Sequence, residues 1–183
     1  MKNKSLQNIT EGAMMIALSL VLNLLRLPAD WLGGTGGSVE LTMLPLMVYA
    51  LRRGWLRGCA AGVLFGTLKC IIGGGIAYGW ASLLLDYAAA FGVTGVAGLC
   101  KKSPAAGALA GSLCRWAVHV LSGVILWGAW MPDMFLGHAM SNIWIYSLLY
   151  NGVYMAANTI LAVVVIYLLA KKTRILSVDI EKN

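Results

Sequence analysis

Charged residues are scarce in this chain of 183 residues. Asp, Glu, Lys and Arg make up 11% of it, whereas a soluble domain carries about a quarter. Apolar residues make up 60% and the mean hydropathy is +0.78, which excludes a disordered chain and a soluble monomer. The apolar runs are long and do not alternate with polar residues, so we expect an all-α membrane protein rather than a β-barrel.

Several chemical motifs are also missing. The chain has no P-loop, so it cannot hydrolyse ATP by itself, and it has no H-E-x-x-H motif or paired-carboxylate site. Its four cysteines form no C-x-x-C pair, which disfavours a metal site and says nothing about disulfides. The net charge of +7 comes from basic clusters between apolar runs, which is typical of membrane topology signals and not of nucleic-acid binding. No cofactor is expected.

Six apolar runs predict six transmembrane helices in a single domain covering residues 1–183. A bilayer core requires about 20 helical residues at about 1.5 Å each. The predicted helices are 9–27, 39–51, 55–72, 79–99, 105–127 and 142–170. The first resembles a signal peptide because Lys2 and Lys4 precede it, but no small-x-small cleavage site follows, so we expect it to be retained.

Most basic residues fall on one side of this arrangement. Eleven of the 14 Lys and Arg residues lie at the two termini, after the second helix or after the fourth. The loops on the opposite side hold Asp30, Glu40, Asp133 and His138. The positive-inside rule therefore predicts a multi-pass protein of the cell membrane with both termini in the cytoplasm, and it favours an even number of helices.

Small residues recur at four-residue spacing on three predicted helices. Such residues let another backbone approach closely. Packing inside the bundle explains any one group, and docking against another protein is the alternative. The groups are Ala13 and Ala17; Gly58, Gly62 and Gly66; and Gly107 and Gly111.

Three polar residues lie inside apolar helices. An ionisable group there costs about 2.5–3.5 kcal/mol, so it usually has a partner or a function. Asp86, His119 and Asn151 come from three different helices, and helix geometry places each of them about 10–14 Å below the outer surface. Their common depth predicts a pocket open to the outside in the outer half of the membrane.

Aromatic residues surround these three positions. His119, Gly123 and Trp127 lie at i, i+4 and i+8, on one stripe of their helix. A carboxylate, an imidazole and aromatic rings together suit a flat, cationic ligand that forms hydrogen bonds. The tyrosines nearest to the acid and the amide are Tyr87, Tyr146, Tyr150 and Tyr154.

Each of these residues also has an alternative interpretation. Asp86 could pair with Arg115 or Lys69 to hold helices together, and His119 could be a core histidine. A small intramembrane enzyme could use Asp86 and His119 as acid and base, with Ser122 as the nearest nucleophile, but no oxyanion donors are evident. The tryptophans near helix ends are ordinary interfacial residues by default, namely Trp127, Trp130 and Trp144.

Three ordered segments carry a resemblance to a known family. They are 77–87, 119–128 and 146–152, and residues 43–45 and 53–54 also agree. These segments resemble the thiamine-binding S-components of energy-coupling factor transporters, and the resemblance covers nearly the whole chain. The resemblance implies the six-helix S-component fold and a non-enzymatic protein that binds thiamine from outside without modifying it. An S-component for another vitamin or another small cationic heterocycle is the alternative.

The same resemblance implies roles for individual residues. Asp86 would face the positively charged ligand, His119 and Trp127 would stack with its rings, and Gly123 would be the small residue beside them. Trp31, in the first outer loop, would cover the site. The other implied substrate-binding residues are Tyr78 at the pocket edge, Tyr87, Tyr146 and Asn151.

The resemblance further implies partners. An S-component works with a transmembrane coupling protein and two cytoplasmic ATPase subunits, which drive release of the vitamin inward. In that family the first helix carries an A-x-x-x-A surface for the coupling protein, and Ala13 and Ala17 match it.

Overall fold

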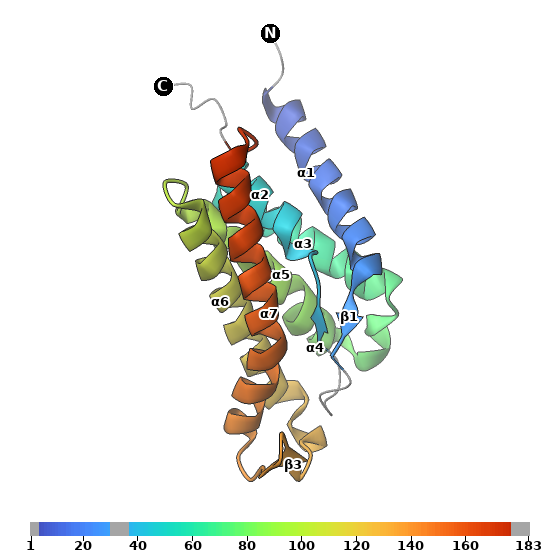
Figure 1. Ribbon diagram of the computed structural model, residues 1–183. Helices are drawn as coiled ribbons and strands as arrows, with labels where there is room; N and C mark the ends of the chain where they lie inside the picture. Colours follow the sequence, from blue (N-terminus) through green and yellow to red (C-terminus); the bar gives the residue numbers. More distant parts are fainter. Residues whose placement is uncertain (1–3, 30–36, 177–183) are drawn as a thin grey trace.

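The computed structural model describes residues 4–29 and 37–176, except for the side chains of residues 77 and 78. In this part of the chain it shows a helical bundle with two small two-stranded sheets, of which the one containing β3 lies at one end (Figure 1). The main helices are α1 (Lys4–Leu22), α2 (Met43–Arg53), α3 (Trp55–Ile72), α6 (Pro104–Leu126) and α7 (Ile143–Lys172). The antiparallel strand pairs are β1 (Leu27–Pro28) with β2 (Ser38–Val39) and β3 (Met134–Phe135) with β4 (His138–Ala139).

The fourth predicted helix is continuous but irregular. It runs from Trp80 to Leu99 and contains a π-helical stretch, which places one more residue in each turn. Asp86 and Tyr87 lie in that stretch. Its parts are α4 (Trp80–Ser82), the π-helix η4 (Leu83–Ala89), α5 (Ala90–Gly92) and the 3-10 helix η5 (Val93–Leu99). Three further 3-10 segments are η1 (Asn23–Leu25), η3 (Gly75–Tyr78) and η6 (Gly128–Trp130).

The helical prediction is confirmed. Six helical segments occur within the described residues, and α3 has the predicted bounds. Five of the segments are long and apolar enough to cross a membrane. The sixth, α2, has 11 residues, which is too short for a bilayer core of about 30 Å. It lies inside the bundle, and Met43–Leu51 are all buried.

The second helix begins later than predicted. We predicted a start at Val39, but Val39 belongs to β2 and pairs with Leu27 of β1. The next residue, Glu40, donates its backbone N–H to Asn158 Oδ1 of α7 at 2.7 Å. These tertiary contacts hold the chain extended, so the helix starts only at Met43.

The first described turn of α1 and the last turn of α7 lie at the same end of the bundle (Figure 1). The end of α2 is there too, because Arg52 donates to the Ile175 carbonyl and pairs with Glu11 of α1. Both described ends of the chain therefore lie at one end of the bundle, although five of its six helical segments are long enough to cross a membrane. The cytoplasmic location of this end stays a prediction from the positive-inside rule.

Glycines of α3 set how closely the fourth helix packs. A Cβ at Gly62 would collide with the Phe91 carbonyl oxygen, and one at Gly66 would collide with the Tyr87 carbonyl oxygen. The backbones of the two helices are therefore in direct contact beside Asp86. For these glycines, packing inside the bundle is the correct interpretation and docking to another protein is not. The same holds for Gly107 and Gly111 of α6, which face the backbone of η5.

We expect Gly62→Ala to destabilise the bundle, although alanine is the better helix former. Overpacking costs about 1–3 kcal/mol, which exceeds the roughly 0.5–1 kcal/mol that alanine contributes in a helix interior. The matched control is Gly152→Ala on α7, where the nearest atom to the new Cβ is Trp116 Nε1 at 3.8 Å. Thermal unfolding in detergent, followed by circular dichroism, should show a lower Tm for Gly62→Ala and an equal or higher Tm for Gly152→Ala. Equal Tm values for the two variants would contradict the close packing.

Candidate functional site

A cavity of about 590 Å³ lies among the fourth helix, α3, α6 and α7. Pro28, Gly37 and Ser38, in and beside the β1–β2 pair, line it on one side, and Trp130 of η6 lines it on another. Seven of the nine predicted substrate-binding residues line this one cavity: Asp86, Tyr87, His119, Gly123, Trp127, Tyr146 and Asn151. The structure therefore brings together residues from three helices that the sequence predicted at one depth.

Two predicted residues are outside the described part of the structure, and one predicted helix surface is separate from the cavity. Trp31 falls outside the described residues, and so does the side chain of Tyr78, whose backbone ends η3. Ala13 and Ala17 lie on the exposed face of α1, while Gly12 and Ser19 form its buried side.

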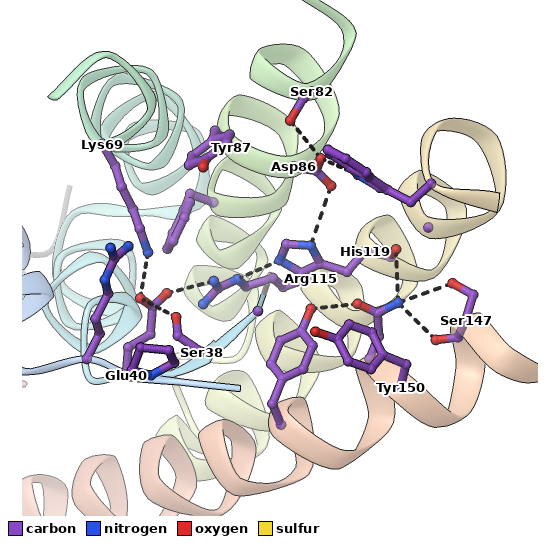
Figure 2. A pocket seen from close by; sticks show the side chains of 18 of the residues that line it. Ser38, Glu40, Lys69, Ser82, Asp86, Tyr87, Arg115, His119, Ser147 and Tyr150 are labelled. Atoms are coloured by element: carbon purple, nitrogen blue, oxygen red, sulfur yellow. Dashed lines mark hydrogen bonds and ion pairs between the residues drawn. The ribbon is translucent and has the colours of Figure 1, made fainter. Parts of the chain in front are cut away.

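The Asp86 carboxylate accepts hydrogen bonds from three neutral groups, and Figure 2 shows the one from Ser82. Ser82 Oγ donates to Oδ2 at 2.8 Å, Trp127 Nε1 donates to the same oxygen at 2.9 Å, and Ser122 Oγ donates to Oδ1. His119 Nδ1 lies 3.9 Å from Oδ1. No Lys or Arg side chain of the described segments forms an ion pair with this carboxylate. Its negative charge can therefore act on a cationic ligand in the cavity.

Three residues on one side of α6 lie near this carboxylate. His119, Gly123 and Trp127 all line the cavity, as their four-residue spacing predicts. A Cβ at Gly123 would collide with Ser147 Oγ of α7. The glycine therefore lets α7 approach α6 closely, and this contact fixes the wall between His119 and Trp127.

Asn151 and three tyrosines of α7 form the opposite wall. The Asn151 Nδ2 group donates to the Ser147 carbonyl oxygen at 2.9 Å and to the His119 carbonyl oxygen at 3.3 Å. Its Oδ1 accepts from the Tyr154 hydroxyl at 2.6 Å. The rings of Tyr146 and Tyr150 stack with centroids 5.7 Å apart. Asn151 thus joins α6 to α7 and holds an aromatic surface beside the cavity.

The sequence analysis missed a buried charged cluster in the same cavity. Glu40 was expected in an outer loop, but it is only 3% exposed and forms ion pairs with Lys69 of α3 at 2.5 Å and Arg115 of α6 at 2.8 Å. Burial raises the pKa of Glu40, but the two neighbouring cations outweigh burial and lower it to about 2. The carboxylate is therefore ionised and neutralises one of the two cations.

One signal in the sequence points to this cluster. Three of the 14 Lys and Arg residues lie outside the basic clusters of the topology prediction. These three, Arg26, Lys69 and Arg115, all line the cavity. A basic residue that breaks the positive-inside pattern needs a partner inside the protein, and Glu40 is that partner for two of them.

One alternative interpretation is wrong. Lys69 and Arg115 pair with Glu40 and not with Asp86, so Asp86 does not hold helices together through either of them. Ser122, the nucleophile named for the enzyme alternative, donates its hydroxyl to Asp86. In the described part of the chain, no group of three or more His, Cys, Asp or Glu side chains could hold a metal ion.

The chain is similar to known proteins over most of its length. A family model described as "Thiamine transporter protein (Thia_YuaJ)" matches residues 9–178. The thiamine transporter ThiT of Bacillus subtilis (strain 168) is 31% identical over 189 residues, which cover 92% of each chain. The thiamine transporter ThiT of Lacticaseibacillus paracasei is 28% identical over 184 residues, covering 90% of this chain and 87% of the relative.

A solved structure of ThiT from Listeria monocytogenes has a similar fold. Its TM-score is 0.81 at 24% identity, and the match covers 95% of this chain and 98% of the other. The predicted fold class is therefore confirmed.

Proposed function

The chain belongs to the thiamine transporter family, and on this premise we propose that it is the substrate-binding subunit of an energy-coupling factor importer. It is a component of thiamine transport in the cell membrane, with a transport role and not an enzymatic one. In the proposal it captures thiamine from outside with high affinity, and partner subunits drive uptake with ATP.

The Asp86 carboxylate is the observation that carries the proposed binding mode. Thiamine combines a thiazolium ring with a permanent positive charge and a flat aminopyrimidine ring with hydrogen-bonding groups. Among the described residues, Asp86 receives hydrogen bonds from three neutral groups and forms no ion pair with a Lys or Arg side chain, so its charge remains for the thiazolium. His119 and Trp127 present rings on either side of Gly123, and aromatic faces attract a cation by about 0.5–2 kcal/mol.

The remaining predicted contacts complete the proposed site. Tyr146 and Asn151 would bound the ligand from α7, and Tyr87 would bound it from η4. Tyr78 and Trp31 stay predictions from the family resemblance, at the pocket edge and in the covering loop.

The proposed partners are a transmembrane coupling protein and two cytoplasmic ATPase subunits. The chain lacks a P-loop, so energy for transport must come from another subunit. The exposed Ala13 and Ala17 on α1 offer a surface where a second helix can approach closely. This face is the proposed docking site for the coupling protein.

Thiamine should quench the tryptophan fluorescence of the purified protein. Trp127 and Trp130 line the cavity, so a ligand there would contact two of the seven tryptophans. Calorimetry on the same sample gives the affinity. The hydroxymethyl aminopyrimidine without the charged ring, and choline without any ring, should each bind far more weakly than thiamine.

Flat fluorescence and calorimetry at micromolar thiamine, with folded protein, would exclude thiamine as the ligand. Mass spectrometry of the molecules that co-purify with the protein would then test the alternative of another vitamin or cationic heterocycle.

A further inference from the structure

Arg115 contacts four different groups at the centre of the bundle. It is 4% exposed, and its guanidinium carbon lies 4.0 Å from the centre of the Phe91 ring. In the plane of the guanidinium, Nη2 donates to Glu40 Oε1 at 2.8 Å and Nη1 lies 3.6 Å from Met43 Sδ. The third nitrogen, Nε, donates to His119 Nε2 at 3.3 Å, as Figure 2 shows. Only a planar, three-nitrogen side chain can make all of these contacts together.

The contact from Arg115 determines where His119 carries its proton. A nitrogen that accepts a hydrogen bond must keep its lone pair, so Nε2 is unprotonated and the ring is neutral with its proton on Nδ1. Nδ1 is the atom that faces Asp86, 3.9 Å from Oδ1. The imidazole therefore presents an N–H donor beside a carboxylate acceptor, on the cavity side of the ring.

The other groups around His119 do not compete for Nε2. The Tyr154 ring packs edge-on with centroids 6.1 Å apart, and its hydroxyl donates to Asn151. Glu40 and Lys69 lie on the far side of Arg115 and pair with each other. Asp86 faces Nδ1.

We propose that Arg115 is a positioning residue for the ligand site, which fixes the Nδ1–H tautomer of His119 and so aims a hydrogen-bond donor next to the Asp86 carboxylate. A ligand in the cavity beside this pair meets a donor and an acceptor side by side. The inference rests on the proposed function, because it takes the part of the cavity that His119 and Asp86 line as the place where thiamine binds. It adds a role for Arg115, a residue that lies behind His119 and reaches the ligand only through that ring.

The tautomer can be read directly by nitrogen NMR of the purified protein labelled with 15N-histidine. The chain has two histidines, and His138→Gln assigns the signals because His138 lies on the exposed β4 strand. Without ligand, wild-type His119 should be in the Nδ1–H form. Arg115→Lys keeps a positive charge near Glu40 but loses the Nε donor, so His119 should shift toward the Nε2–H form that solvated imidazole prefers. Thiamine affinity of this variant should fall about tenfold, the equivalent of one lost hydrogen bond.

Lys69→Met is the matched control. It perturbs the same charged cluster by removing one of the two cations that pair with Glu40, but the hydrogen bond to His119 comes from Arg115, so the Nδ1–H form should persist. A tautomer shift in Lys69→Met as large as that in Arg115→Lys would show a general effect of the charged cluster and would overturn the proposal.

Two further results would also overturn it. One is an Nε2–H form of His119 in the wild-type protein, and this result would overturn the proposal even if Arg115→Lys fails to fold. The other is an unchanged tautomer with unchanged thiamine affinity in Arg115→Lys. If wild type has the Nδ1–H form and does not bind thiamine, the proposed function fails while the control of His119 by Arg115 stands.

Discussion

Replacing Asp86 with Asn is expected to weaken thiamine binding by about ten- to a hundredfold, because a hydrogen bond to a charged group contributes about 1.5–3 kcal/mol. The substitution preserves the shape of the site. The Asn carbonyl can still accept from Ser82 and Trp127, and the new amide can donate to the hydroxyl of Ser122, which rotates to accept. The loss should therefore come from the removed charge. Calorimetry of the two purified proteins gives the ratio of affinities.

Asp133→Asn is the control for this result. Asp133 is an exposed carboxylate just before β3, outside the residues that line the cavity. Removing it changes the net charge by the same amount, so affinity should stay at the wild-type value. Unchanged affinity in Asp86→Asn together with a lower Tm would show that Asp86 acts in stability and would refute its role in binding.

The helices could be predicted because residues close to each helix end determine where the helix begins or ends. Apolar length sets each span, and Pro104 starts α6 where its missing N–H is tolerated. The Asn142 side chain accepts from the backbone N–H groups of Trp144 and Ile145, which caps the start of α7. None of these features depends on distant parts of the chain.

The cavity was predictable only in part. Asp86, His119 and Asn151 are polar residues in apolar runs, and a constant rise per residue converts their positions into a common depth. No comparable sequence pattern indicates the π-helix around Asp86. It depends on how η4 packs against the α3 glycines, and Gly66 lies against the backbone of Tyr87. Its effect is to change which side of the fourth helix each residue faces.

The charged cluster required tertiary information. Glu40 pairs with Lys69, 29 residues later, and with Arg115, 75 residues later. Position along the chain assigned Glu40 to an outer loop, because it follows the glycine-rich stretch 33–37 that separates the first two apolar runs. Only the fold brings α3 and α6 to both sides of this carboxylate. The start of α2 at Met43 likewise depends on distant contacts, because Val39 pairs with Leu27 and the Glu40 N–H donates to Asn158.

A double replacement of Ala13 and Ala17 by Trp should abolish uptake and leave thiamine binding intact. Both alanines are exposed on one face of α1, and the bundle meets the other face, where a Cβ at Gly12 would lie 2.9 Å from the Tyr49 hydroxyl oxygen. Two indoles on the exposed face would not disturb the six helical segments. They would keep a partner helix from approaching closely, and close approach is what small residues provide.

The experiment measures ligand binding and partner docking separately. Thiamine affinity of the purified variant tests the bundle, and uptake by cells together with co-purification of the coupling protein and ATPases tests docking. The matched control is Ile160→Trp with Val164→Trp on α7, an exposed pair at the same four-residue spacing that faces away from the fold. It adds the same bulk at a site where we propose no partner, so uptake should continue.

The outcomes separate the two interpretations of this alanine pair. An alanine pair in an internal seam would overpack when enlarged, at a cost of about 1–3 kcal/mol, and thiamine binding and folding would be lost together. That result would refute the docking surface, and so would normal uptake with both indoles in place. Lost uptake with full thiamine affinity, beside an active α7 control, would locate the coupling surface on α1. Capture of the vitamin and coupling to energy would then reside on two separate surfaces of one small bundle, because the cavity that holds Asp86 and the exposed face of α1 share no residue.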